Sequence, residues 1–498
     1  MPSVGFRPQP PVDDVVHALP VASAAQLARF FVLGIALDVA LNGQRPGLGL
    51  LLFAIAVAIV MRPSMQPGAE RDALLLAAVA FAAFIPLRAS ESLTALNVLT
   101  SASLFGLAAA RDETPLIWAR VEGYIRRAIH IVVSIVRAPA GLLGPLARLI
   151  GSVGGERLRS AVRWTLIVAP VLAIFLALLA SADRVFGDLL LPGWPDLDLT
   201  GVASHTALIV LGALAGATLW LAARRPLLPP FPGTGESIFP QIRFAEWAAV
   251  LAGLDLLFAI FVGVQATFLF GGQRSVDVTP GLTYAQYARS GFFQLIVVAA
   301  LTALVILAGW DLGARTDRRS ERAFRLLVTV MVGLTGVILA SALLRLALYE
   351  GAFGFTMNRL AGYVTICWIG AVLVILAVTI WTGARDRLIT LVVIAGLASA
   401  FAVNLVNPER FVAERNVARF RATGKIDIEY LLSLGPDAKP SVASVLSELP
   451  LEQAVFERLC EQAETLAREP SGWRSANLGR ASARAALDAA GVTPQRCP

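Results

Sequence analysis

Residues 245–270 have the sequence AEWAAVLAGLDLLFAIFVGVQATFLF, in which only Glu246 and Asp255 are charged. A run of about 20 predominantly apolar residues is long enough to cross the hydrocarbon core of a bilayer as a helix. The whole chain has the same character, since 57% of its 498 residues are hydrophobic and only 15% are charged. A soluble domain is about 25% charged, so this composition predicts a surface that faces lipid.

Similar apolar runs recur along the chain and give eleven candidate spans. They lie near residues 24–42, 47–62, 72–87, 90–110, 163–182, 203–223, 245–270, 290–311, 323–348, 358–382 and 387–406. The second and third runs are short for a span. We therefore expect an all-α fold, a polytopic transmembrane helical bundle of about eleven spans with a small helical C-terminal tail domain.

The hydrophobic pattern also divides the chain into five parts. We predict a disordered N-terminal tail at 1–23, a four-helix membrane segment at 24–110, a basic cytoplasmic amphipathic segment at 111–162, a seven-helix membrane core at 163–407 and a helical C-terminal domain at 408–498. The last part is predicted because the composition after Pro408 resembles that of soluble proteins, with helical patterns separated by Gly435-Pro436, Pro450 and Pro470.

Arginine in the connections between spans predicts the orientation. Lys425 and Lys439 are the only lysines, and the arginines concentrate in the connections after the fourth, sixth, eighth and tenth spans. Short cytoplasmic loops carry an excess of Lys and Arg. We therefore expect the N-terminus to be cytoplasmic and the C-terminus to be extracytoplasmic. Because the side of the C-terminus follows from parity, one span more or fewer would reverse it.

Residues 117–136 are apolar enough to resemble another span. Arg126 and Arg127 would then lie near the bilayer centre, at a cost of about 2.5–3.5 kcal/mol each. An amphipathic helix in the interface plane fits better. Its apolar face would carry Trp118, Val121, Ile125, Ala128, Val132 and Ile135, and its polar face Arg120, Arg127, His130 and Arg137.

That amphipathic helix suggests which molecules contact the chain. We expect the polar face to point toward headgroups, so that residues 117–163 contact the lipid bilayer and anionic lipid headgroups. The simplest role is a surface anchor, and lipid sensing is the alternative. In so apolar a chain, an excess of basic residues is typical of cytoplasmic loops and of contact with anionic lipid headgroups. We therefore expect no nucleic-acid partner.

Asp255 lies about midway along its span, where an ionisable group is costly and must face the bundle interior or a wet cavity. It is therefore a candidate buried ionisable site. One interpretation is an ion or proton site; the other is a protonated carboxyl hydrogen-bonded to a neighbouring helix. Arg345 is not expected to pair with it, because it lies roughly 10–15 Å nearer the outer surface at 1.5 Å per residue.

Many other polar residues lie near the outer surface in this orientation. The candidate outer-face polar site consists of Asp183, Arg184, Gln265, Tyr284, Tyr287, Arg289, Arg345, Glu350 and Asn407. These side chains would form a polar vestibule or a docking face, and their arginines suit a carboxylate or a phosphate. The alternative is that they are simply the polar ends of helices.

Several outer-side segments form a longer pattern. The most specific is LTYAQYARSGFF at 282–293; the others are LASADRVF at 179–186, QATFLFGG at 265–272, RLALYE at 345–350 with GFT at 354–356, NLVNP at 404–408 and DIEYL at 427–431. Over roughly residues 160–480 the chain resembles the bacterial membrane family called domain of unknown function 4173. The resemblance implies a multi-pass protein of the bacterial envelope and brings no established substrate. We expect the chain in the bacterial inner (cytoplasmic) membrane.

Signals of catalysis are missing from the sequence. It contains no phosphate-binding loop, no Gly-x-Ser-x-Gly elbow and no His-Glu-x-x-His helix. The three cysteines and three histidines are too far apart for a metal-ligand pattern. We therefore expect no catalytic, cofactor-binding or metal-binding residue, and enzyme activity stays an open alternative. Cys460 and Cys497 can form a disulfide in an oxidising compartment or remain two free thiols.

Three functions are compatible with these patterns. The first is a transporter-like or ligand-binding bundle with an outward-facing polar site, in which Asp255 is the coupling residue. The second is a non-catalytic envelope scaffold or sensor that docks envelope protein partners through its outer face and tail. The third is an intramembrane transferase that uses Asp183, His205 or Glu350.

Overall fold

The computed structural model describes residues 22–110, 114–151, 199–224, 242–271, 292–314, 317–449, 453–493 and 497. Within these ranges the regular secondary structure is helical apart from two paired strands of two residues each, β1 (Ile242–Arg243) and β2 (Gly313–Ala314). The expected all-α fold is confirmed. The span predicted at 163–182 and nearly all of the tail predicted at 1–23 lie outside the described residues.

The first group of helices packs around one hydrophobic core. Its members are α2 (Ala24–Leu41), α3 (Leu48–Met61) with the 3-10 turn η1 (Arg62–Ser64), α4 (Ala69–Ala83), α5 (Glu91–Ala109) and α9 (Leu199–Arg224). Ser23 begins α2 with a capping box to Gln26. Glycines let α2 and α9 approach closely, because a Cβ at Gly212 would lie 2.7 Å from the Leu33 carbonyl oxygen. Helix α9 thus packs on α2, and the division of the chain into five parts stays a prediction.

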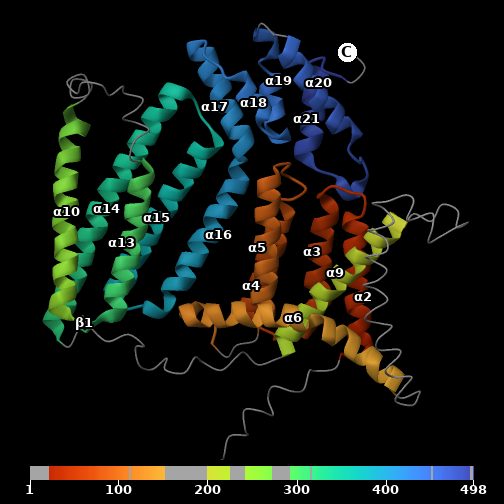
Figure 1. Cartoon of the computed structure of the whole chain (residues 1–498), viewed down its shortest axis with the longest axis horizontal. Helices are drawn as coiled ribbons and strands as arrows, with labels where there is room; N and C mark the ends of the chain where they lie inside the picture. The colour runs from red at the N-terminus through yellow and green to blue at the C-terminus, as the bar shows by residue number, and fades with distance from the viewer. Residues whose placement is uncertain are drawn as a thin grey trace, which may run out of the picture.

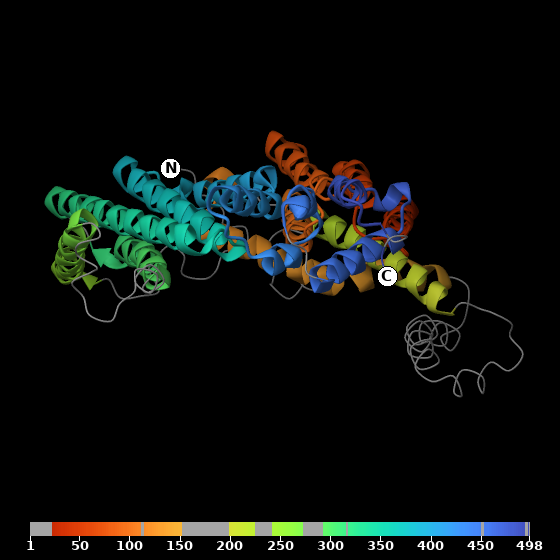
Figure 2. The ribbon, with the colours of Figure 1, turned by 90° about the horizontal axis from the view of Figure 1, so that it is seen from above.

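The second group has a separate core. Its members are α10 (Phe244–Gly271), α13 (Phe292–Leu312), α14 (Arg318–Phe353) and α15 (Met357–Thr382). Helix α16 (Leu388–Val406) follows the 3-10 turn η3 (Arg385–Arg387) and lies between the two groups (Figures 1 and 2). It packs on α15, and its Phe401 ring meets Phe81 and Phe84 edge-on, with centroid distances of 6.1 and 5.1 Å.

Seven of the described helices are long and apolar enough to cross a membrane: α2, α5, α9, α10, α14, α15 and α16. Helices α3 and α13 add shorter apolar segments. Helix α4 has 15 residues and carries Glu70, Arg71 and Asp72 in its first turn. The chain is therefore a helical membrane protein, and the count of eleven spans stays a prediction.

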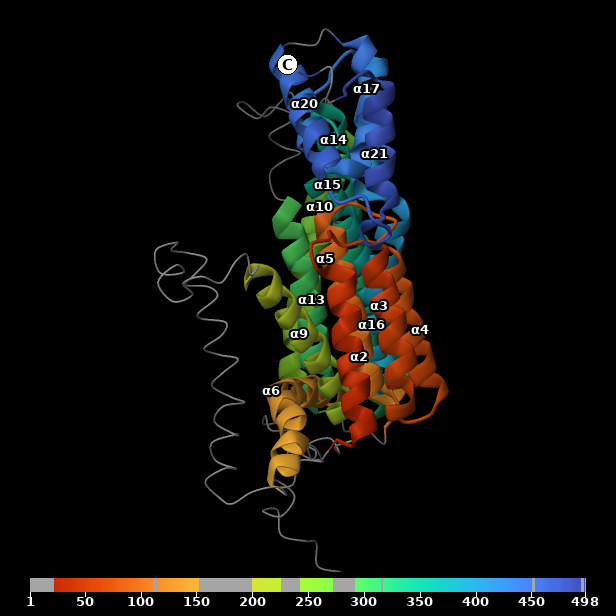
Figure 3. The ribbon, with the colours of Figure 1, turned by 90° about the vertical axis from the view of Figure 1, so that its right-hand side faces the viewer.

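The amphipathic helix predicted at 117–136 is present as α6 (Val121–Gly151), which follows the 3-10 turn η2 (Leu116–Trp118) and runs across one end of the bundle (Figures 1 and 3). The predicted orientation of its polar face is wrong at Arg127 and His130, which are buried against the bundle. Arg127 donates to the Thr114 carbonyl, and the His130 Nε2 atom lies 3.0 Å from the Ala222 carbonyl oxygen.

The reason for this reversal is the end of α9. The last four carbonyl groups of a helix lack partners within it, and Ala222 belongs to that last turn of α9. His130 of α6 bonds to one of these carbonyls and Arg127 to the Thr114 carbonyl, so this polar face lies against the protein and apolar side chains of α6 face away from it. Val132, Ile135 and Val136 are accordingly exposed.

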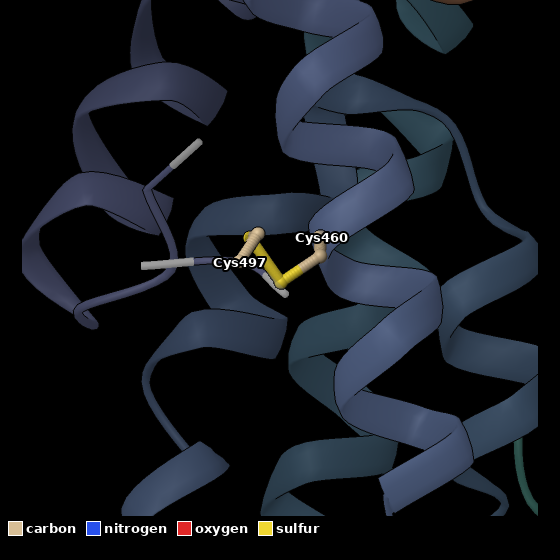
Figure 4. The surroundings of a disulfide bond; sticks show 2 residues. All are labelled: Cys460 and Cys497. Carbon is tan, nitrogen blue, oxygen red and sulfur yellow. A yellow bond between two sulfur atoms is a disulfide. The ribbon is translucent and has the colours of Figure 1, made fainter. Parts of the chain in front are cut away.

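The C-terminal domain covers the opposite end of the bundle from α6 (Figure 1). It contains α17 (Pro408–Thr423), α18 (Ile428–Ser433), η4 (Pro436–Ala438), α19 (Lys439–Ala443), η5 (Leu446–Glu448), α20 (Gln453–Arg468), η6 (Trp473–Ser475) and α21 (Leu478–Ala489) around a third core. Cys460 of α20 forms a disulfide with Cys497 (Figure 4). Of the two alternatives for these cysteines, the structure has the disulfide.

The buried amides of Asn97 on α5 and Asn404 on α16 donate to each other, with N···O distances of 2.8 and 2.9 Å. Replacing Asn97 with Leu should lower the free energy of unfolding by about 0.5–2 kcal/mol, because the Asn404 amide loses its partner. Thermal unfolding in a mild detergent measures this change. The double variant Asn97→Leu/Asn404→Leu should recover part of the loss. A loss in the double variant equal to the sum of the losses in Asn97→Leu and Asn404→Leu would contradict the pairing.

Candidate functional site

An apolar groove of about 240 Å³ lies between α15 and α16, near the end that the C-terminal domain covers. Its lining residues come from both helices and from the first residue of α17: Leu360, Tyr363, Val364, Cys367, Ser399, Ala402, Val403, Val406 and Pro408. Among the described cysteines, Cys367 is the free one, and it is exposed. The groove therefore offers an apolar slot on two membrane-long helices.

Polar groups gather at the end of the groove nearest the C-terminal domain. The Tyr363 hydroxyl donates to the Glu350 carboxylate over 2.9 Å. Arg359 stacks on the Tyr349 ring with 4.1 Å from its Cζ atom to the centroid. The guanidinium groups of Arg359 and Arg415 both lie within electrostatic range of the Tyr363 hydroxyl. We call Tyr349, Glu350, Arg359, Tyr363 and Arg415 the rim of the groove.

The C-terminal domain holds the connection between α14 and α15 in place, and with it the rim. The Asn416 side chain of α17 bonds to both the amide and the carbonyl of Phe355, over 3.0 and 2.7 Å. The Met357 amide donates to the Tyr430 hydroxyl over 2.8 Å. Gly354 has a φ of +83°, and a Cβ there would lie 2.6 Å from the Asn416 Oδ1 atom. Such support from backbone contacts fixes a site before a ligand binds.

The structure brings only some of the predicted outer-face residues close together. Gln265 of α10 is buried and accepts from the Ser341 hydroxyl of α14, with Arg345 one turn further along α14. Glu350 belongs to the rim, and Asn407 is a buried left-handed residue, with a φ of +53°, between α16 and α17. The remaining predicted residues lie outside the described ranges: Asp183, Arg184, Tyr284, Tyr287 and Arg289.

Asp255 is buried on α10, on the face that carries Leu251 and Phe258 and packs against α14. Neither of its carboxylate oxygens has a hydrogen-bond partner among the described residues. Asp255 precedes Gln265 by ten residues, which is about 15 Å of helix, and Arg345 lies beyond the Gln265 level. The side chains of Asp255 and Arg345 are therefore too far apart to form an ion pair.

A buried cluster that the sequence did not reveal fastens the C-terminal domain to the connection between α4 and α5. The Asp437 Oδ2 atom accepts from the Ala89 amide over 2.9 Å, and burial raises the pKa of both Asp437 and Glu409. Lys439 is only 3% exposed and donates to the carbonyls of Leu432 and Leu434 over 2.9 and 2.8 Å. Burial lowers the pKa of the Lys439 ammonium to about 8.

A second contact that the sequence did not predict joins α2 to α9. The His205 Nδ1 atom lies 2.9 and 2.8 Å from the two carboxylate oxygens of Asp38. A carboxylate that orients an imidazole is one part of acid–base catalysis. The neighbouring Ser204 hydroxyl instead bonds to Asn42 and Gly201. Within the described part of the chain, His205 therefore has a carboxylate partner in Asp38 but no hydrogen-bonded hydroxyl that could act as a nucleophile.

The chain matches the family described as Domain of unknown function (DUF4153) over residues 73–445, and it belongs to that family. The number 4173 in the sequence resemblance is corrected by this match, whereas the class, a family of unknown function, is confirmed. The match includes the groove and its rim and begins within α4, before the region of the resemblance. No curated protein and no solved structure matches the chain.

The buried ammonium of Lys439 predicts how the stability of the C-terminal domain depends on pH. Its pKa is 10.5 in an unfolded chain and about 8 in the folded one, so between these values the unfolded state binds more protons. Stability should therefore rise as pH increases from about 8 to about 10.5. Replacing Lys439 with Met should abolish this rise in thermal unfolding midpoints measured across that range.

Lys425, the other lysine, is exposed and provides the control. The variant Lys425→Met removes the same charge without removing a buried ammonium, so it should keep the alkaline rise. An equal rise in Lys439→Met and in the unmodified chain would show that the Lys439 ammonium is not buried in the folded protein.

Proposed function

We propose that this chain is a transporter-like bundle of the bacterial inner membrane that binds an amphiphile at an outward-facing site. The observation that carries this proposal is the groove between α15 and α16, whose apolar walls end at the charged rim. Polar groups alone would not define a ligand, whereas a groove that is apolar along its walls and charged at one end selects an amphiphile.

The chemistry of the groove selects the ligand class. Small-molecule sites are mostly apolar clefts with a few polar groups that set orientation. An acyl chain fits the slot beside Val364 and Cys367. Two arginines outnumber the single carboxylate at the rim, and guanidinium groups suit phosphate and carboxylate oxygens. We therefore infer an amphiphile with one inserted chain and an anionic headgroup.

Features at the two ends of the bundle support the proposed orientation. At the end near α6, arginines stack on tryptophans in three pairs, Arg325 on Trp381, Arg385 on Trp310 and Arg387 on Trp118, at 5.9, 5.6 and 4.3 Å. Tryptophans mark membrane boundaries and arginines mark the cytoplasmic side. At the other end the Cys460–Cys497 disulfide favours an oxidising compartment. The N-terminus is then cytoplasmic and the C-terminal domain extracytoplasmic.

The envelope scaffold or sensor remains the alternative function. Deleting residues 409–498 does not test it cleanly, because the C-terminal domain forms buried contacts with the bundle, such as those of Asn477 with the Ile85 and Arg88 carbonyls. The Asp38–His205 pair is the observation that favours the transferase alternative, but the neighbouring Ser204 hydroxyl bonds to Asn42 and not to His205.

The reactivity of Cys367 tests the amphiphile site. Lysophosphatidylglycerol with an oleoyl chain should slow alkylation of Cys367 by a small maleimide at least several-fold, because an inserted chain covers the thiol. Replacing Arg415 with Gln should weaken this protection about tenfold, the effect of losing about 1.4 kcal/mol of headgroup contact. The rate of alkylation by mass spectrometry is the measurement.

Leu405 provides a matched control, since it is exposed on α16 and does not line the groove. A cysteine at this position in a Cys367→Ser background should be alkylated at the same rate with and without the amphiphile. Equal protection at both positions would indicate general coating by the amphiphile and would contradict the proposed site.

We also propose that Asp255 is the residue that couples transport to an ion gradient. Asp255→Asn should leave amphiphile protection of Cys367 unchanged, because the carboxyl lies in α10 and outside the groove. It should abolish uptake of the amphiphile driven by an ion gradient in proteoliposomes, since an amide cannot carry the proton or ion charge. Normal uptake by this variant would remove Asp255 from the mechanism.

A further inference from the structure

We propose that a pocket at the α6 end of the bundle binds the phosphate group of an anionic phospholipid. The pocket has a volume of about 320 Å³ and lies between η2, the start of α6 and η3. Its polar lining includes Thr114, Arg120, Glu122, Arg126 and Asp386, and Trp118 forms an aromatic wall. This site is separate from the groove and does not depend on the proposed function.

The charges around the pocket favour an anion. Arg120 and Arg126 line it, Arg387 stacks on Trp118 at 4.3 Å, and buried Arg127 follows Arg126 in α6. Among the described residues that line the pocket, the two arginines are balanced by Glu122 and Asp386. The positive charge available to an anion therefore comes from Arg387 beside Trp118 and from the guanidinium donors that these ion pairs leave unused. Arg120 contacts Asp386 through its Nε atom at 2.6 Å, and a guanidinium carries five N–H donors, so this contact leaves its Nη donors for a phosphate.

The position of the pocket indicates that the phosphate belongs to a lipid. Trp118, Trp310 and Trp381 each lie under an arginine at this end of the bundle, the level at which tryptophans meet headgroups. Beside the pocket, the side chains of Ile117, Val121 and Ile125 are about half exposed, at 49%, 52% and 46%. A phospholipid fits both features, with its phosphate in the pocket and its chains along the apolar side chains.

The site also relates the two helical groups to each other. Trp118 lies just before α6 and Arg126 lies in it, and α6 packs on α9 of the first group. Asp386 and Arg387 belong to the turn between α15 and α16. The two sides already contact each other where the Tyr124 and Thr390 hydroxyls lie 3.0 Å apart. A bound phosphate would therefore bridge them at this end.

Native mass spectrometry of the full chain in a neutral detergent tests the proposal. Dioleoyl phosphatidylglycerol should bind with a saturable component that dioleoyl phosphatidylcholine lacks and that depends on the pocket arginines. The variant Arg120→Gln/Arg387→Gln should bind phosphatidylglycerol at least tenfold more weakly, because two charge-assisted contacts are lost. As a control, Arg318→Gln/Arg322→Gln removes two exposed charges from α14, and it should bind like the unmodified chain.

Further outcomes keep the test decisive if the double variant folds poorly. Asp386→Asn releases Arg120 from its carboxylate partner and should strengthen phosphatidylglycerol binding. Equal binding of the two lipids, or equal losses in both double variants, would overturn the proposed pocket. Competition by glycerol 1-phosphate at the concentration of the lipid itself would indicate a site for a soluble phosphate and would overturn the lipid assignment.

Discussion

The mutual hydrogen bonds of Asn97 and Asn404 hold α16, the helix that lies between the two helical groups. Two amides buried among apolar side chains fix the register of α5 against α16, because a slip would leave both without partners. Just beyond them, Arg88 donates to the carbonyls of Asn404 and Leu405. The left-handed turn at Asn407 then directs the chain into α17. The placement of the C-terminal domain over the bundle follows from this fixed end of α16.

Both proposed binding sites lie along the boundary that α16 forms between the groups. One wall of the groove is α15 of the second group, and the other wall is α16, which Asn404 fastens to the first group. The phosphate pocket at the opposite end likewise has one side from α6 and another from η3. A shift of one group against the other would therefore change both proposed sites together.

The sequence predicted the all-α fold and the long apolar helices of the described ranges, because apolar length and glycine punctuation act locally. It identified 245–270 as a span and separated Asp255 from Arg345, since both conclusions need only the helical rise. It could not identify partners across the fold. The pairing of Asp38 with His205 and the contact of His130 with the end of α9 each depend on a carboxylate or carbonyl that is distant in sequence. The groove has no motif, because apolar residues that line a slot and residues that face lipid look alike.

The length of α14 has a consequence for the groove. Its 36 residues extend about 54 Å at 1.5 Å per residue, whereas the hydrocarbon of a bilayer is about 30 Å thick. The helix is far longer than that thickness, and its uncharged stretch, residues 326–344, ends before Glu350. In the proposed orientation we therefore expect the last turns of α14 to project into the aqueous layer, with the rim in contact with water and the groove within the hydrocarbon. A headgroup there can exchange its contacts with water for contacts with the protein, and it does so without entering a medium of low dielectric constant.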